Sequence, residues 1–199
     1  HQDGVNDAAF SPDGTRILTA SADKTAKLWD SASGKLIASF DHQDSVKNAA
    51  FSPDGTRILT ASADHTAKLW DAVPLSRWIA SRMTSGKLMV SFDHQDAVNH
   101  AAFSPDGTRI LTASADHSAK LWDAASGKLI VSFNHQDEVL QAAFSADGAR
   151  ILTAGNDKTA KLWDAALGKP IASFVHRDTV ESAAFSADGA RILTAGNDK

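Results

Sequence analysis

Short runs of alternating apolar and polar residues, separated by turn signals, fill this chain from its first residues onward. Within residues 1–41 the runs are VNDAAFS (5–11), TRILTAS (15–21), TAKLWD (25–30) and LIASF (36–40). The segments PDG, ADK and SASGK lie between them, and Pro, Asp, Ser and Gly favour turns through their backbone preferences. Alternation in runs that contain β-branched residues is typical of strands. The pattern therefore predicts four strands and no helix in this stretch.

The same pattern recurs along the chain. HQD begins at residues 1, 42, 94 and 135, and HRD begins at residue 176. A repeat of this length with four strands in each unit predicts an all-β repeat domain. We therefore expect a single repeat domain over residues 1–199. Its units are 1–41, 42–93 with an insertion at 73–83, 94–134, 135–175 and a partial fifth at 176–199, which holds two strands.

Two motifs mark the units. KLWD stands at residues 27–30, 68–71, 120–123 and 161–164, and FSPDG or FSADG precedes it in every unit. This combination resembles the WD40 β-propeller family, which implies that each unit is one propeller blade. The resemblance also implies a buried, hydrogen-bonded tetrad of His, Thr, Asp and Trp in each blade. Carried over by position, the tetrads are His1, Thr19, Asp23 and Trp29; His42, Thr60, Asp64 and Trp70; His94, Thr112, Asp116 and Trp122; His135, Thr153, Asp157 and Trp163; and, without a Trp, His176, Thr194 and Asp198.

One position departs from the family pattern. The family usually has Gly before the tetrad His, whereas this chain has Asp41, Asp93, Asn134 and Val175. Asp and Asn tolerate left-handed backbone better than a β-branched residue does. We therefore expect left-handed backbone at the first three positions and a different turn before His176.

Thr, His and Asp in one motif also suggest a catalytic triad. A nucleophile needs access to substrate and an oxyanion hole, and one protein seldom repeats an active site in every unit. Buried Thr, His, Asp and Trp side chains can instead satisfy one another, which avoids the cost of unpaired polar groups. We therefore expect a structural role for the tetrads and no catalytic residue.

No metal ion or cofactor is expected. The chain has no cysteine, and its His residues show no zinc or calcium spacing. His65 and His117 occupy a turn position where other units have Lys, which predicts a solvated turn. The glycines fall in repeat turns or strands rather than in a phosphate-binding loop.

Charge and hydropathy limit the partners. The chain has 24 acidic and 20 basic residues, with a formal net charge of −4. Nucleic-acid binding requires a concentrated basic surface, so no nucleic-acid partner is expected. No apolar stretch approaches the roughly 20 residues that span a bilayer, and no signal peptide is visible. We expect no membrane partner and a cytoplasmic location.

Individual function can reside only where the units differ. These positions cluster at the entry to the first strand of each unit, which lines the central channel in the propeller architecture. The candidate partner contacts there are Lys47, Asn99, His100, Leu140 and Glu181. Leu140 is apolar where the equivalents are polar, which suggests an anchor. The alternative is neutral variation at solvated positions.

The insertion adds a second group of candidates. Leu75, Trp78, Ile79 and Met83 fall at helical spacing, and Pro74 suits a first helical turn. A helix of about 10 residues is marginal alone, so it must pack on something. It either folds against its own blade or presents Arg77, Trp78 and Arg82 to a neighbouring domain or subunit. We expect it on the face opposite the tetrad His and Asp turns.

The number of blades leaves the ring open. A propeller closes with about 4–8 blades because open sheet edges and blade faces are unfavourable. Either the remaining blades of a longer parent chain or another chain completes the ring. The near-identical repeats with the sequence FSPDGTRILTASAD also resemble those of bacterial multidomain signalling proteins. This resemblance implies a non-catalytic scaffold or sensor that binds a protein or peptide. The alternative is a structural repeat whose incomplete blades self-associate into an oligomeric propeller.

Overall fold

The computed structural model describes residues 1–72 and 84–197, and every regular element in these ranges is a β-strand. We number the five sheets as blades 1 to 5 in chain order. Blade 1 comprises β1 (Val5–Phe10), β2 (Arg16–Ser21), β3 (Thr25–Asp30) and β4 (Leu36–Asp41), with β8 (Thr84–Ser85) added at its edge. Blade 2 comprises β5 (Val46–Phe51), β6 (Arg57–Ser62), β7 (Thr66–Asp71) and β9 (Lys87–Asp93).

The later blades follow the same order. Blade 3 comprises β10 (Val98–Phe103), β11 (Arg109–Ser114), β12 (Ser118–Asp123) and β13 (Leu129–Asn134). Blade 4 comprises β14 (Val139–Phe144), β15 (Arg150–Gly155), β16 (Thr159–Asp164) and β17 (Pro170–Val175). Blade 5 is the pair β18 (Val180–Phe185) and β19 (Ile192–Gly196). The all-β fold and the repeated four-stranded antiparallel sheets confirm the prediction from the sequence.

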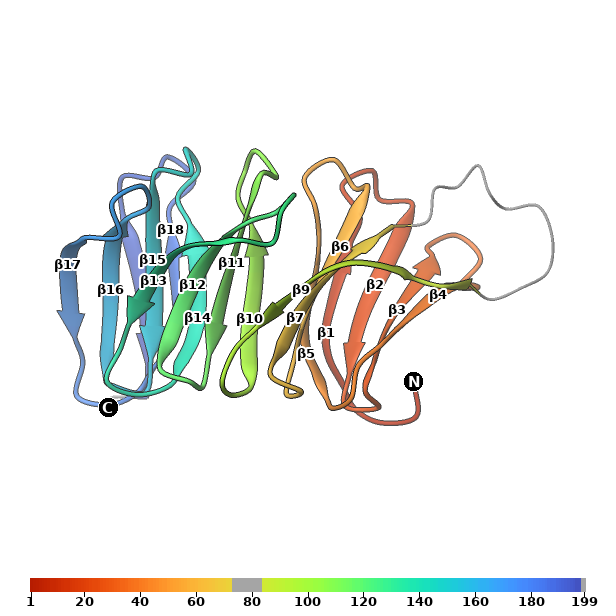
Figure 1. Cartoon of the computed structure of the whole chain (residues 1–199), viewed down its shortest axis with the longest axis horizontal. Coiled ribbons are helices and arrows are strands. Elements are labelled where there is room, and N and C mark those ends of the chain that lie inside the picture. The colour runs from red at the N-terminus through yellow and green to blue at the C-terminus, as the bar shows by residue number, and fades with distance from the viewer. Residues whose placement is uncertain (73–83, 198–199) are drawn as a thin grey trace.

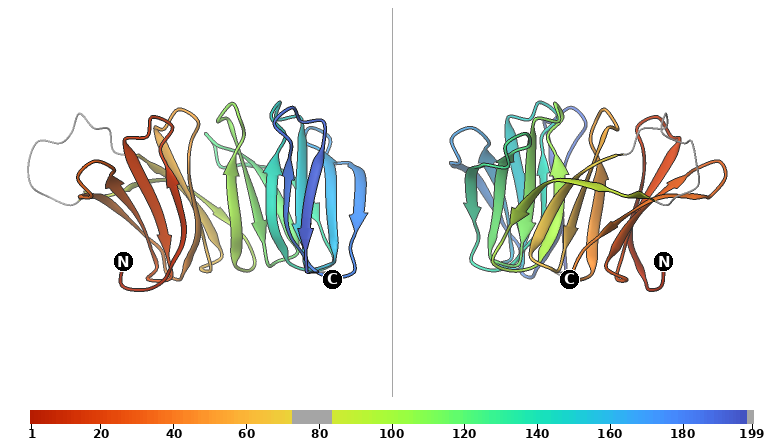
Figure 2. Two further views of the ribbon diagram at one scale, coloured as in Figure 1. Left: turned by 180° about the vertical axis from the view of Figure 1, so that it is seen from behind. Right: turned by 45° about the vertical axis from the view of Figure 1, so that its right-hand side comes forward.

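The blades stand side by side in an open arc. Figure 1 shows blade 1 at one end and the last blades at the other, and Figure 2 shows the inner strands from behind. The inner strands β1, β5, β10, β14 and β18 contact one another in that order. The sheets do not join into a closed ring.

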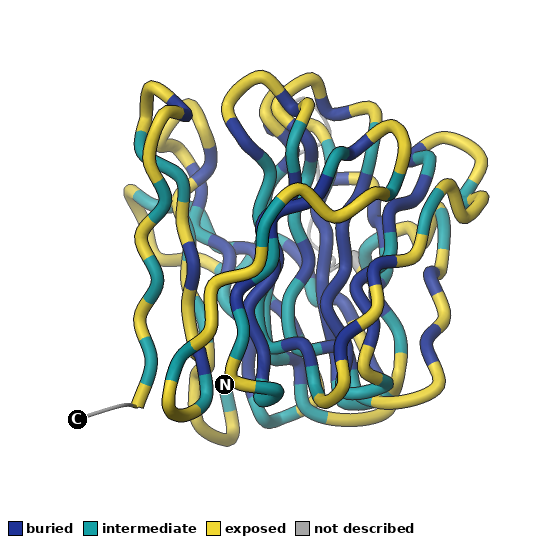
Figure 3. Tube along the Cα trace, turned by 90° about the vertical axis from the view of Figure 1, so that its left-hand side faces the viewer, coloured by how far each residue is buried: buried dark blue, intermediate teal, exposed yellow. Residues whose placement is uncertain are grey.

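The hydrophobic core lies between blades. One cluster joins Leu18, Leu28 and Phe40 of blade 1 to Val46 and Trp70 of blade 2, and all of these are buried. The ring centroids of Phe40 and Trp70 are 5.4 Å apart. Equivalent clusters join the next pairs of blades. Figure 3 shows the result, with buried positions between the sheets and exposed positions at the turns. Each blade is therefore stabilised by its neighbours, as stacked repeats generally are.

The segment after the insertion departs from the repeat. In blade 3 the turn into the outer strand is closed by a hydrogen bond from the Asp123 amide to the Lys128 carbonyl. In blade 2, β8 instead pairs in parallel with β4, and the Gly86 amide donates to the Ser39 carbonyl at 2.9 Å. The chain then crosses to blade 2 and forms β9 (Figure 1). This route ties the outer edges of blades 1 and 2 together.

The expectation of left-handed backbone before the tetrad His is wrong. Asp41, Asp93, Asn134 and Val175 are the last residues of the outer strands β4, β9, β13 and β17, where backbone is extended. Among the described residues, the non-Gly residues with positive φ are instead the turn residues Lys24, His65, His117 and Lys158. A β-branched residue suits the end of a strand, so Val175 creates no exception. The exposure of His65 and His117 agrees with a solvated turn.

The ends of β7 and β8 locate the insertion. Asp71, the last residue of β7, pairs with Arg57 beside the turn between β5 and β6. The tetrad residue Asp64 lies at the other end of the same strands. The flanks of the insertion are therefore at the end of the blade opposite the tetrad turns. The expected helix over residues 74–83 lies outside the described residues.

Candidate functional site

The expected tetrad residues come together inside the blades. In blade 2 the His42 Nδ1 is 2.8 Å from Asp64 Oδ2, and its Nε2 is 2.7 Å from Thr60 Oγ1. The Trp70 indole donates to the same Thr60 hydroxyl at 2.9 Å. A neutral imidazole with its hydrogen on Nδ1 donates to the carboxylate and accepts from the hydroxyl. Blades 1, 3 and 4 have the same contacts at 2.6–2.9 Å. In blade 5, His176 Nε2 is 2.9 Å from Thr194 Oγ1, and Asp198 lies outside the described residues.

The tetrad environment shifts the pKa values of its Asp and His side chains. Burial alone raises the pKa of the Asp64 carboxyl, but hydrogen bonds from His42, Thr66 and the Gln43 amide outweigh burial and hold the pKa below its usual range. Burial lowers the pKa of the His94 imidazole, although the Asp116 carboxylate opposes that change. Both shifts favour an ionised Asp beside a neutral His.

The tetrad is unsuited to nucleophilic catalysis. The Thr60 and Thr112 side chains are fully buried, and each hydroxyl already bonds to His and Trp. A nucleophile must reach a substrate and hold it beside an oxyanion hole. The polar atoms of the tetrads are thus bonded to one another within the blade. Among the described residues, no group of three or more His, Asp, Glu or Cys side chains is placed to hold a metal ion.

The variable positions of the inner strands reach the neighbouring blade. The register shifts at one residue in each inner strand, which re-aims that side chain as β-bulges do. At this position Lys47 donates to Asn99 Oδ1 at 2.7 Å, and Asn99 donates to the Val139 carbonyl at 3.0 Å. These candidate partner contacts thus already bond between blades. Sequence reasoning missed this role because the partner lies one whole unit further along the chain.

The next position makes a second set of bonds between blades. Asp7 and Asn48 accept from the amides of Ala49 and Ala101, respectively, at 3.1 Å each. His100 occupies this position in blade 3, where its Nδ1 is buried and has no hydrogen bond. Burial lowers the pKa of His100, although the Asp7 carboxylate opposes this change. The lowered pKa favours the neutral imidazole.

The remaining candidates lie in different places. Leu140 is half-buried at the bulge of β14, and Glu181 is exposed and accepts from the Asn197 amide group at 2.9 Å. Arg77, Trp78 and Arg82 lie outside the described residues, so their contact role stays a hypothesis.

An arginine in each of the first four units links that blade to the next. The Arg57 guanidinium lies over the Phe103 ring, 5.3 Å from its centroid, and donates to the Gly107 carbonyl at 2.8 Å. The same pair of contacts recurs for the other linking arginines, Arg16, Arg109 and Arg150. Sequence reasoning missed this link as well. The sequence feature that could have indicated this link is the Arg that recurs two residues after the PDG or ADG turn in every unit.

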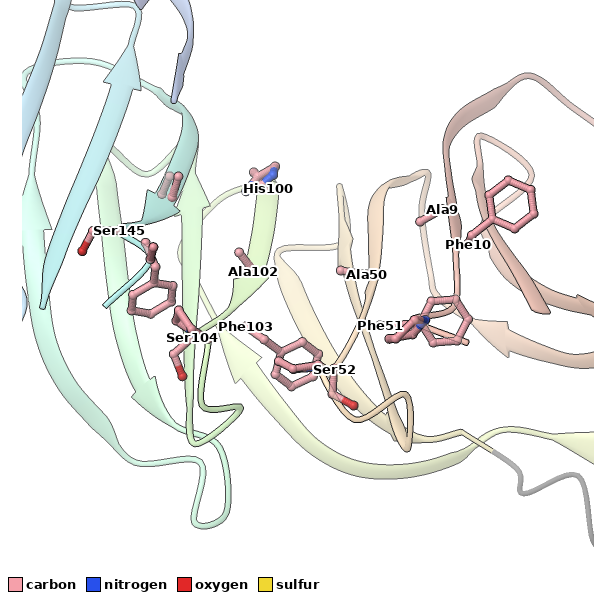
Figure 4. Close-up of a pocket in the computed structure, with 17 residues that line it drawn as sticks. Ala9, Phe10, Ala50, Phe51, Ser52, His100, Ala102, Phe103, Ser104 and Ser145 are labelled. Carbon is pink, nitrogen blue, oxygen red and sulfur yellow. The ribbon is translucent and has the colours of Figure 1, made fainter. Parts of the chain in front are cut away.

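A groove of about 510 Å³ runs along the inner wall of blades 1 to 4. Its lining includes an alanine and a phenylalanine from each inner strand, with Ser and Pro from the turns that follow. Figure 4 shows Phe51 and Phe103 beside Ala50 and Ala102, with His100 further along β10. None of the lining residues is Asp, Glu, Lys or Arg. The groove therefore suits an uncharged, mostly apolar occupant.

Comparison with known proteins identifies the family. The family model "WD domain, G-beta repeat" matches residues 1–30, 34–71, 86–123, 127–164 and 168–199. The chain belongs to the WD40 repeat family. Its members are generally protein-interaction scaffolds rather than enzymes.

Several curated relatives match parts of the chain. Ribosome assembly protein 4 of Saccharomyces cerevisiae is 55% identical over 40 residues, which are 20% of this chain and 8% of that protein. Periodic tryptophan protein 2 of the same yeast is 50% identical over 40 residues, 20% of this chain and 4% of that protein. Pre-mRNA-processing factor 17 of Homo sapiens is 28% identical over 124 residues, 62% of this chain and 20% of that protein. The chain thus spans a fifth or less of each of these relatives.

Proposed function

We propose that this WD40 chain is a non-catalytic scaffold that binds a protein or peptide segment along its inner wall. The observation that carries the proposal is the apolar groove across four blades, with no Asp, Glu, Lys or Arg in its lining. The tetrads support the same conclusion because their polar groups are already bonded to one another. Leu140 is the one apolar residue at the bulge position and extends this wall as a candidate anchor.

The resemblance of the repeat sequence to bacterial proteins suggests that the scaffold is part of a cytoplasmic multidomain signalling protein of bacterial type, and no other observation supports this assignment. The relatives described above come from eukaryotes, and two of their names refer to ribosome assembly and pre-mRNA processing. These relatives support a protein-interaction role and leave the bacterial assignment without support of its own. None of the described residues forms a helix long and apolar enough to cross a bilayer.

A pulldown with the whole parent chain tests the proposal. Ala102→Glu places a charge in the groove, Leu140→Asp removes the candidate anchor, and Lys24→Glu is a control at an exposed turn. We expect the first two variants to lose the same bound proteins and the control to retain them. If all three variants recover the same bound proteins equally, the binding site is not on the inner wall. If the unmodified chain recovers no protein specifically, the scaffold function is wrong. Trp78→Ala in the same experiment tests the insertion.

Self-association is a second candidate function, favoured by the faces of the first and last blades. Val5 is 54% and Leu193 is 71% exposed, whereas the equivalent residues Val46 and Leu18 are 0% exposed. These two faces match the two sides of the interface that joins consecutive blades. Size-exclusion chromatography with light scattering tests the idea on the 199-residue chain. A discrete dimer supports it, and a stable monomer rules it out.

A further inference from the structure

The outer strands of blades 2 to 4 leave large aliphatic side chains in solvent. Five of them are between 46% and 53% exposed. Together with the lysine that precedes them in each blade we call them the outer belt: Lys87, Leu88 and Met89; Lys128, Leu129 and Ile130; Lys169 and Ile171. In blade 1 the equivalent residues Leu36 and Ile37 are only partly exposed, and Ile37 packs against a core cluster. Exposed aliphatic residues that recur at the same place on neighbouring blades give a candidate interaction surface.

The exposure of the outer belt is not a sign of poor packing. Blades 2 and 3 have a neighbouring blade on both sides. In the same strands, Phe92 of β9 and Phe133 of β13 are 0% exposed. The strands therefore bury one set of side chains between blades and present another set to solvent. Figure 1 shows β9 and β13 on the side of the molecule facing the viewer.

The lysines of the outer belt are available for a partner. Within the described residues, the Lys87, Lys128 and Lys169 amines make no ion pair and no hydrogen bond. Other lysines are engaged, since Lys120, for example, lies 3.4 Å from the Asp116 carboxylate. The neighbouring Asp123 carboxylate already accepts from the Ser126 amide and hydroxyl. Both bonds go to Asp123 Oδ1, and the Asp123 charge partly offsets that of Lys128.

A turn of the next blade lies against a valine side chain in the middle of two of these outer strands. A Cβ on Gly127 would lie 2.6 Å from Val90 Cγ1, so the turn of blade 3 sits directly on β9. Gly168 of blade 4 has the same relation to Val131 of β13. The outer edge of β4 already pairs with β8. The outer belt is distinguished by its aliphatic and lysine side chains, and a partner that docks on these side chains uses both.

We propose that the outer belt binds an amphipathic helix of a partner protein, with aliphatic residues on one face and Glu or Asp along its rim. An apolar helix face crosses several blades through residues at i, i+3, i+4 and i+7, and acidic rim residues complement the unpaired lysines. The proposal rests on the proposed function for the class of partner, a protein. It assigns that partner a surface separate from the inner groove.

A designed peptide tests this surface directly. The probe is a fluorescent, capped peptide of about 18 residues, long enough to form a helix, with a Leu face and a Glu rim. Two controls are the same composition in an order that breaks the apolar face, and a version with Lys in place of Glu. Fluorescence anisotropy measures binding to the 199-residue chain. We expect the first peptide to bind, more weakly as salt rises, and both controls to bind at least about tenfold more weakly.

Variants of the chain locate the binding. Lys128→Glu with Lys169→Glu, and Ile130→Ser alone, should each weaken binding about tenfold or more. Lys24→Glu reverses one lysine charge outside the outer belt and should leave binding unchanged. All these positions are on the surface, so an unchanged thermal midpoint verifies that each variant is folded.

Three results overturn the proposal. The first is equal binding of the Glu-rimmed and Lys-rimmed peptides. The second is a loss of peptide binding in Lys24→Glu that is as large as the loss in the outer-belt variants. The third is no binding of the first peptide, and lysine-dependent binding to phosphatidylcholine–phosphatidylserine vesicles in its place assigns the surface to a membrane. None of these results bears on Ala102→Glu or Leu140→Asp in the pulldown, so failure here and failure of the scaffold function are distinguishable.

Discussion

Arg57 of blade 2 lies over the ring of Phe103 in blade 3, with 5.3 Å between the guanidinium carbon and the ring centroid. The same guanidinium donates to the Gly107 carbonyl in the next turn. One side chain thus combines a cation–π contact with a charge-assisted hydrogen bond across the interface between blades. Because the arrangement recurs at consecutive interfaces, it contributes to the stacking of every pair of blades.

Replacing this arginine should destabilise the arc. Arg57→Ala removes the cation–π contact and leaves the Gly107 carbonyl without its donor, so we expect a loss of about 2–3 kcal/mol in the free energy of unfolding. Urea denaturation measures the change. Arg191→Ala is the matched control, because Arg191 holds the same repeat position and is exposed in blade 5. Equal losses for the two variants contradict the role of the contact.

His100 should be a weak point that a substitution can repair. At the equivalent position Asn48 Oδ1 accepts from the Ala101 amide at 3.1 Å, whereas the buried His100 Nδ1 has no partner. We expect His100→Asn to accept from the Ala142 amide and to raise the free energy of unfolding by about 1 kcal/mol. The reciprocal Asn48→His should lower it by a similar amount, as urea denaturation can show. A His100→Asn protein less stable than the original contradicts this account.

The strands and tetrads could be predicted because the repeat presents their signals many times. Alternation, turn residues and KLWD all act within one unit, so the sequence predicts each blade locally. The contacts between blades could not be predicted in this way. Lys47 and Asn99 are separated by a whole unit with its insertion, and nothing local shows that a bulge aims one at the other.

The left-handed turn was misplaced for a related reason. The family position before the tetrad His suggested Asp41, but the tight turn is the one between the second and third strands. There Lys24 has a φ of 69°, a backbone conformation that local residue preference does not predict for Lys. The outer belt was also missed, because exposed aliphatic residues in a strand are distinguished from buried ones only after the blades are stacked.

Stability should fall as the solution becomes acidic. Burial lowers the pKa values of His94, His100 and His135 from their ordinary value of 6.5. Below about pH 6.5 the unfolded chain therefore binds protons that the folded chain does not, so the free energy of unfolding decreases as pH drops toward the folded pKa values. Thermal midpoints between pH 7.5 and 5 measure the slope. His100→Asn removes one of these groups and should reduce the slope, and an unchanged slope contradicts the contribution of His100.

Gly86 should be required for the link between blades 1 and 2. A Cβ on Gly86 would collide with the ring of Phe40, which is fully buried in the core cluster between these blades. The ring cannot move cheaply in a packed core, so we expect Gly86→Ala to lower the free energy of unfolding by about 1–3 kcal/mol. Gly4→Ala is the matched control, because a Cβ there has nothing within 4 Å and blade 3 carries Ala97 at the same position. Amide hydrogen exchange should also be faster at residue 86 in the variant than in the original protein, where the Gly86 amide donates to the Ser39 carbonyl. If Gly86→Ala unfolds at the same urea concentration as Gly4→Ala, the route of the chain over β4 does not stabilise the two blades.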